Sequence, residues 1–347
     1  MLKQIFFGFV VALAGSLIAA AIGTPIPWLL GSLILTAIFR INGANILCHV
    51  GIRKVGQWII GISLGLHFVP ETVEIIKNLL PYVIAGGFFA LTIGLIGSAI
   101  LYKWGNVDYA TAYFGSTVGG ASEMVVLAEK NGSTNLSLVA SAHSLRVLLI
   151  VILIPFSYQF LGLKGELGLQ VQLAEYSYLG LIKLLALTGI GCYILEKIKA
   201  PNAMMLGGIL VTAMLTANGI VFTHLQPEIQ HIGQMFLGWA LGSNYKSGFF
   251  KQAPSFFTAV TLMTLVYLIL AFVFCVAVAH ISGIYFPTSG LAMSPGGLAE
   301  MALTAKVLML GAPLVTSFQV SRLIFILLTA GPIYQGLNKY LSKKGIV

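Results

Sequence analysis

The chain has 347 residues, of which 58% are hydrophobic and only 8% are charged, and its mean hydropathy is +0.96. A soluble domain averages about 25% charged residues, so this composition excludes an ordinary soluble protein and predicts a polytopic membrane protein. The net charge is +9, but Lys and Arg are scattered rather than gathered in a stripe, which argues against nucleic-acid binding.

Apolar elements follow one another along the whole chain, six in each half. The first half has them near residues 5–22, 26–41, 54–69, 79–103, 108–129 and 136–160. The second half has them near residues 177–195, 201–221, 231–246, 255–281, 286–306 and 313–336. Most approach the ~20 residues that a helix needs to cross a bilayer. Residues 1–22 resemble a signal peptide, but an internal apolar run fills the same place in the second half. We therefore expect a retained transmembrane helix.

The two halves repeat an ordered set of residues about 177 positions apart. Apolar residues match by chance, whereas an ordered set of glycines, prolines, amides and charges does not. We therefore predict two homologous membrane repeats, residues 1–165 and residues 166–347. The matching positions are Pro25 and Pro201, Asn42-Gly43 and Asn218-Gly219, Gly56-Gln57 and Gly233-Gln234, Gly119-Gly120 and Gly296-Gly297, Glu123 and Glu300, and Arg146 and Arg322.

The fifth element of each half differs from the others in its glycine and proline content. Its first copy contains Gly119-Gly120, and its second contains Pro295 followed by Gly296-Gly297. Glycine and proline weaken helical hydrogen bonding, and irregular backbone at membrane depth is tolerated only inside protein or along a cavity. The sequence therefore predicts a broken or re-entrant segment in each copy.

Loop charges indicate how many elements cross the bilayer. If all of them cross, Lys and Arg divide about 10 to 7 between the two faces, and if the third element of each half does not, about 11 to 6. If instead the fifth element does not cross, the division is about 13 to 4. The strongest asymmetry favours an all-α protein with about ten spanning helices, two broken or re-entrant segments and inverted repeats. Both termini are then expected in the cytoplasm, with the protein in a bacterial inner membrane.

Ionisable residues inside a membrane are expensive and indicate functional sites. Each Glu follows a Gly-Gly pair, and each Arg lies in the next apolar helix. Half-helix N-termini would bind an anionic group, the arginines would clamp a carboxylate, and the glutamates would carry a coupling proton. The candidate substrate- or ion-binding residues are Glu123, Glu300, Arg146, Arg322, Gly119, Gly120, Gly296, Gly297, Ser116, Ser122 and Ser294.

Structural roles are the alternative for the same residues. Each Glu would pair with an Arg and lock its copy together, and the serine hydroxyls would satisfy backbone groups freed by the breaks. His143, where the second copy has Gln319, is either a proton carrier or a packing residue. The His and Cys residues show no metal-ligand spacing, and no nucleophile with a base or phosphate-binding loop is present. We therefore expect no catalytic residue, metal or cofactor.

Three segments carry a resemblance to a known family: residues 23–31 (GTPIPWLLG), 115–124 (GSTVGGASEM) and 294–301 (SPGGLAEM). Through them the chain resembles the AbrB-duplication membrane protein family, whose members carry the labels ammonia monooxygenase and regulator of aidB expression. The resemblance covers almost the whole chain and supplies no functional residues. The second copy departs from the first at Ala203, Ala299 and Gln319, where the first has Pro27, Ser122 and His143.

Three functions are open on this sequence. The leading one is a secondary transporter that moves a small anion or metabolite by alternating access. The second is a membrane-embedded sensor that binds a small molecule and regulates gene expression. The third, a monooxygenase, would need clustered metal ligands that the sequence lacks, so we do not expect an enzyme. The expected partners are the lipid bilayer, a small-molecule substrate and a second copy, for which a glycine-spaced face such as Gly61-Ser63-Gly65 is suited.

Overall fold

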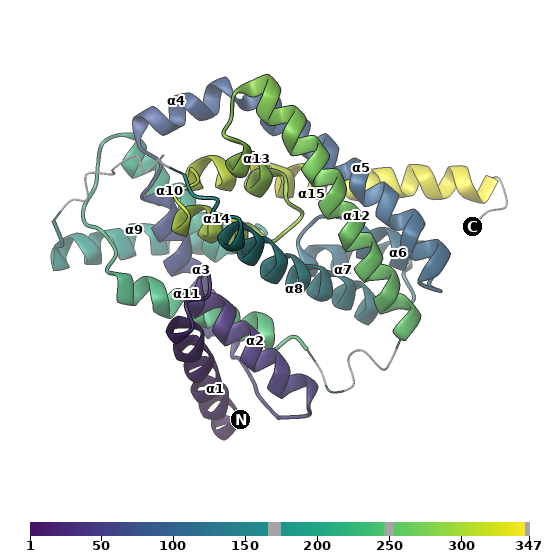
Figure 1. Ribbon diagram of the computed structural model, residues 1–347, viewed down its shortest axis with the longest axis horizontal. Coiled ribbons are helices and arrows are strands. Elements are labelled where there is room, and N and C mark those ends of the chain that lie inside the picture. The colour runs from purple at the N-terminus through teal and green to yellow at the C-terminus, as the bar shows by residue number, and fades with distance from the viewer. Residues whose placement is uncertain (166–174, 246, 248–252, 344–347) are drawn as a thin grey trace. The chain divides into compact units, whose positions relative to one another are not determined.

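The computed structural model describes residues 1–165, 175–245, 247 and 253–343, and the regular structure within these ranges is α-helical (Figure 1). The predicted boundary between the repeats, at residues 165 and 166, adjoins residues outside these ranges. The C-terminal residue 347, predicted to be cytoplasmic, also lies outside them.

The chain divides into two compact units, and each unit takes helices from both halves of the sequence. Unit 1 comprises residues 1–77, 155–249 and 302–314. Its complete or nearly complete helices are α1 (Leu2–Ala21), α2 (Pro27–Ile41), α3 (Val50–Gly65), α4 (Pro70–Asn78), α9 (Tyr178–Lys197), α10 (Ala203–Ala217) and α11 (Pro227–Gly242).

Unit 2 comprises residues 78–154, 250–301 and 315–347. Its helices are α5 (Leu80–Trp104), α6 (Tyr109–Ser116), α7 (Ala121–Lys130), α12 (Pro254–Ser282) and α13 (Phe286–Met293), with most of α8 (Leu136–Phe160) and α15 (Ala312–Lys343) and the first turn of α14 (Leu298–Val307). The compact units therefore do not coincide with the predicted repeats 1–165 and 166–347. Homology between those repeats stays a prediction about the sequence.

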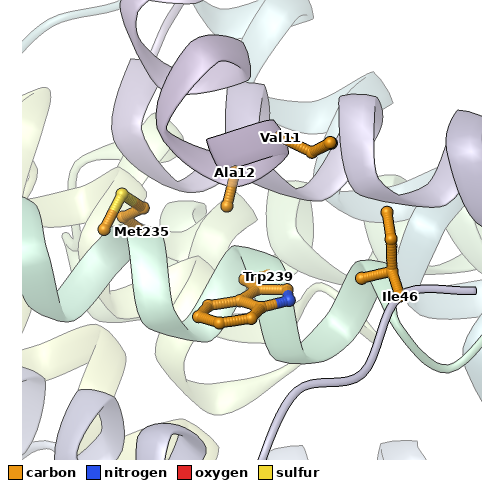
Figure 2. Packing of buried hydrophobic residues seen from close by; sticks show 5 residues of the cluster. All are labelled: Val11, Ala12, Ile46, Met235 and Trp239. Atoms are coloured by element: carbon orange, nitrogen blue, oxygen red, sulfur yellow. The ribbon is translucent and has the colours of Figure 1, made fainter. Parts of the chain in front are cut away.

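Unit 1 is held together by an apolar core and by close helix crossings. Figure 2 shows the indole of Trp239 on α11 lying beneath Val11 and Ala12 of α1, and all three side chains are buried. Gly15 of α1 and Gly31 of α2 face each other so closely that a Cβ on either would collide with the backbone carbonyl of the other. Small residues at a crossing let two membrane helices pack backbone to backbone.

The glycine-spaced face of α3 packs within unit 1. A Cβ added to Gly61 would collide with the backbone of α10 at Met205, and one added to Gly65 would collide with Thr212. These glycines therefore allow α3 and α10 to approach each other closely. The homodimer that this face suggested stays a prediction.

Six of the described helices are long and apolar enough to cross a membrane: α1, α5, α8, α9, α12 and α15. Helices α3 and α4, which meet at a bend of 89°, would together make a seventh, and α2 and α10 are apolar but shorter. The protein is thus an all-α polytopic membrane protein, as its composition predicts. About ten crossings, inverted repeats and the cytoplasmic termini stay predictions.

Candidate functional site at two broken helices

Both predicted helix breaks are present, and both lie in unit 2. The first separates α6, which ends at Ser116, from α7, which begins at Ala121; the second separates α13, which ends at Met293, from α14, which begins at Leu298. Gly120 has φ −71° and ψ 136°, so it takes an extended conformation open to any residue. Glycine there leaves room for the carboxylate of Glu123, which a Cβ at Gly120 would displace.

Asp108 caps the start of the first broken helix. Its carboxylate accepts hydrogen bonds from the backbone N–H of Thr111 (2.8 Å) and from the hydroxyls of Thr111 and Thr134 (2.5 Å each). Burial raises the pKa of Asp108, but these hydrogen bonds outweigh burial and leave the pKa below its usual value. The cap therefore stays charged and fixes where α6 begins.

The arginine of each copy binds the C-terminal end of the half-helix before the break. Arg146 on α8, which is 2% exposed, donates from Nη1 to the carbonyls of Ser116 (3.3 Å) and Thr117 (3.0 Å). Arg322 on α15 donates to the carbonyls of Ser294 (2.6 Å) and Gly296 (2.7 Å). The last carbonyls of a helix lack intrahelical partners, so the arginines satisfy what the breaks leave open.

His143 and Gln319 perform the same role in the two copies although they differ in chemistry. His143 Nε2 lies 2.9 Å from the carbonyl of Phe114, and its Nδ1 lies 3.1 Å from Nη2 of Arg146. Because a carbonyl only accepts and a guanidinium only donates, the proton of His143 sits on Nε2. Gln319 donates from Nε2 to the carbonyl of Leu291 (3.0 Å). Both residues therefore support the last turn of a half-helix.

Two of the three candidate serines bind backbone carbonyls. The Ser116 hydroxyl lies 2.9 Å from the carbonyls of Gly94 and Tyr113, and the Ser294 hydroxyl lies 3.0 Å from that of Leu291. Ser122 is exposed. Ser116 and Ser294 thus have partners on the backbone of the protein, as helical hydroxyls commonly do.

Glu123 and Glu300 take equivalent places at the third position of the half-helices that follow the breaks. The carboxylate of Glu123 folds back over Gly120, and that of Glu300 over Gly297, so that a Cβ on either glycine would collide with a carboxylate oxygen. A carboxylate in the first turn is favoured by the helix dipole. Glu300 is 6% exposed, whereas Glu123 is half-buried.

Helices α8 and α15 each contact both breaks, which brings the breaks together. α8 reaches the first break through Arg146 and the second through Ile150, whose side chain would lie 3.0 Å from a Cβ on Gly296. α15 reaches the second break through Arg322 and the first through Ile326, which would lie 3.1 Å from a Cβ on Gly119. Each pair of contacts is four residues apart, about 6 Å along a helix.

The guanidinium groups at the two breaks interact electrostatically. The charge of Arg146 acts on Arg322, so the two guanidinium groups lie close enough for electrostatic interaction. Nε of each arginine is buried and has no hydrogen-bond partner among the described residues. Each of the two helix breaks thus has a positive group beside it, and each group has an Nε–H without a partner among the described residues.

Tyr267 is a site residue that the sequence did not reveal. It is fully buried on α12, and its hydroxyl donates to the carbonyl of Ser116 (2.8 Å). Gly97 on α5 makes room for it, because a Cβ there would collide with the tyrosine hydroxyl. The signal that could have identified Tyr267 is its place inside an apolar helix, because a buried tyrosine hydroxyl needs a hydrogen-bond partner.

Comparison with known proteins identifies the family of this chain. The family model described as transition state regulatory protein AbrB matches residues 28–338. The chain belongs to the AbrB family. All eleven candidate residues named above fall inside the matched range, and the family resemblance of the three sequence motifs is confirmed.

Two curated relatives of this AbrB-family chain cover nearly all of it. It is 28% identical to the uncharacterised protein YhjN of Bacillus subtilis (strain 168), over 99% of this chain and 95% of that protein. It is 26% identical to a protein of Escherichia coli (strain K12) named as a candidate regulator AbrB, over 93% of each chain.

Within the described ranges, no three His, Cys, Asp or Glu side chains are grouped so that they could hold a metal ion.

Proposed function

We propose that this AbrB-family protein is a secondary transporter that moves a small anion or metabolite by alternating access. The observation that carries the proposal is the reciprocal contact of α8 and α15 with both breaks. Transport folds bind their substrates near the midplane at the junction of two discontinuous helices. On each of these helices the contacts with the two breaks lie about one helical turn apart, which fits that arrangement.

The charge at the breaks supports an anionic substrate. Arg146 and Arg322 contribute two positive charges, and each has an Nε–H without a partner in the described part of the chain. An unsatisfied buried donor costs about 1–3 kcal/mol, and a carboxylate or another oxyanion would accept from it. The N–H groups in the first turns of α7 and α14, which have no partner within their own helix, are further donors of the same kind.

Glu123 and Glu300 are the groups that would couple transport to a proton. Each carboxylate occupies the first turn of a half-helix, where a bound anion would also be attracted. A substrate anion and an ionised glutamate repel each other at this position, so protonation of the glutamate favours anion binding. In this proposal a proton and the anion therefore move together.

Uptake into proteoliposomes tests the proposal. Purified protein is reconstituted, and the entry of radiolabelled small anions and metabolites is followed with and without an inward proton gradient. We expect at least one compound to enter faster than into protein-free liposomes, with a rate that rises with the gradient. Glu300→Gln should reduce gradient-driven uptake of that compound by about tenfold or more.

A membrane-embedded sensor is the second candidate, favoured by the regulator names of the family and of the Escherichia coli relative. A sensor would bind a compound of the same panel without moving it. Saturable binding to the purified protein with no uptake above protein-free liposomes would therefore contradict transport and support the sensor.

A further inference from the structure

A second polar cluster lies in unit 1 and uses none of the residues assigned to the breaks. Lys306, in the last turn of α14, donates from Nζ to the hydroxyl of Ser63 on α3 and to Oε1 of Gln230 on α11, each at 2.5 Å. The Ser63 hydroxyl also lies 3.0 Å from Oε1 of Gln230. Three helices thus converge on one ammonium group.

The neighbours of Lys306 are fixed by bonds of their own. Gln230 donates from Nε2 to the carbonyl of Leu225 (2.8 Å), which turns its Oε1 toward the lysine. His67 lies 2.9 Å from the carbonyl of Ser63 through Nδ1, so this nitrogen carries the proton. The imidazole of His67 is close enough to Lys306 for the two groups to interact electrostatically.

The cluster has a positive charge without a matching negative one. Lys306 is half-buried, and no carboxylate of the described residues forms an ion pair with it. An ammonium carries three N–H donors, and the described part of the chain uses two of them, through Ser63 and Gln230. A charged group in a membrane protein is normally paired, so an anionic ligand is the partner that this cluster lacks.

The first copy of the repeat does not reproduce this lysine. The spacing that relates Glu123 to Glu300 places Glu129 opposite Lys306, and Glu129 is exposed. The basic residue nearest that place is Lys130, exposed in the last turn of α7. A basic residue in the last turn of a helix interacts favourably with the helix dipole. Lys130 supplies that interaction for α7 from an exposed position. The helix dipole alone therefore does not explain the cluster around Lys306. The lysine at this position is therefore particular to the second half of the sequence.

We propose that Lys306, Ser63 and Gln230 form a binding site for a small oxyanion, separate from the site at the breaks. The ammonium supplies the charge, and the Ser63 hydroxyl, whose hydrogen rotates freely, turns from Gln230 to donate to the ligand. The imidazole of His67, which interacts electrostatically with Lys306, adds a polar group to the site. The chemistry suits a carboxylate or an inorganic oxyanion of the sulfate type, both of which present oxygen acceptors to a point charge.

Equilibrium dialysis of the detergent-purified full chain with [35S]sulfate and with [14C]succinate tests this site. We expect saturable binding of at least one probe, and the probe that binds tells an inorganic oxyanion from a carboxylate. Lys306→Gln should weaken that binding by about tenfold or more, and Ser63→Ala by a smaller factor. The matched control Lys130→Gln, which removes the last-turn lysine of the corresponding half-helix, should bind like the wild type.

The variants separate this site from the one at the breaks. Arg322→Gln serves only to locate the binding: its loss in Arg322→Gln together with wild-type binding in Lys306→Gln would place the anion at the breaks and overturn the proposal. Lys306→Arg keeps the charge and serves as the measurement if Lys306→Gln elutes as an aggregate, with weakened but saturable binding expected. Absence of saturable binding of both probes to the wild type, or wild-type binding in Lys306→Gln and Ser63→Ala, would also overturn it.

Discussion

Replacing Arg322 with alanine is expected to lower the free energy of unfolding by about 1–3 kcal/mol, because a buried carbonyl left unsatisfied costs about that much. The carbonyl concerned is that of Gly296, which the guanidinium binds at 2.7 Å; the carbonyl of Ser294, bound at 2.6 Å, keeps a hydrogen bond from Nε2 of Gln319 (3.2 Å). Thermal unfolding of the detergent-purified protein measures the effect. Arg322→Lys should recover only part of it, since one ammonium does not reproduce the planar fork of the guanidinium.

An exposed arginine provides the matched control for this substitution. Arg53 on α3 is exposed, so Arg53→Ala should change the free energy of unfolding by no more than about 0.5 kcal/mol. An Arg322→Ala protein as stable as Arg53→Ala would show that the break keeps its structure without the guanidinium. The role assigned to the arginine would then be wrong.

The same arginines permit a test of the predicted Glu–Arg lock. Arg146 directs its bonds to carbonyls and to His143, so Glu123→Gln and Arg146→Ala should destabilise the protein independently. Mutual rescue in the double variant would instead be the mark of a structural ion pair.

The largest effect on function is expected from adding a single methyl group at Gly120 or Gly297. The φ and ψ of Gly120 suit alanine, but the new Cβ would occupy the space of the Glu123 carboxylate. Gly120→Ala should therefore reduce uptake by about tenfold or more while changing the free energy of unfolding by only about 1 kcal/mol. Gly297→Ala should act in the same way through Glu300.

Gly336→Ala on α15 is the control, since Gly336 is exposed and a Cβ there would meet no atom within 4 Å. It should transport like the wild type and be equally stable or slightly more so. If Gly120→Ala lost stability and uptake in proportion, the glutamate would be a cap of α7 and nothing more. That result would remove Glu123 from the proposed coupling mechanism.

Much of the fold could be predicted because hydrophobicity and helix breakers act locally. The apolar run predicted at 136–160 is α8, and the Gly-Gly pairs at 119–120 and 296–297 do interrupt helices. These features depend on backbone hydrogen bonding within a few residues. The interleaving of the two halves into compact units depends instead on contacts between distant segments, which the sequence of either half does not contain.

The sequence predicted which residues lie at the candidate site better than it predicted their hydrogen-bond partners. Glu123, Arg146 and their counterparts stood out because charges in apolar helices are rare. That the arginines would bind carbonyls could not be inferred, because the direction of a guanidinium depends on how α8 and α15 pack against the breaks. Lys306 was missed although the same rule on intramembrane charge applies to it.

A cryo-electron microscopy map of the nanodisc-embedded protein with the anion identified by uptake is the most direct test of the central claim. We predict ligand density in contact with residues 117–120 and 294–297, flanked by α8 and α15, with Arg146 or Arg322 within hydrogen-bonding distance. Density for that anion elsewhere in the protein, with the two breaks unoccupied at saturating concentration, would contradict the account.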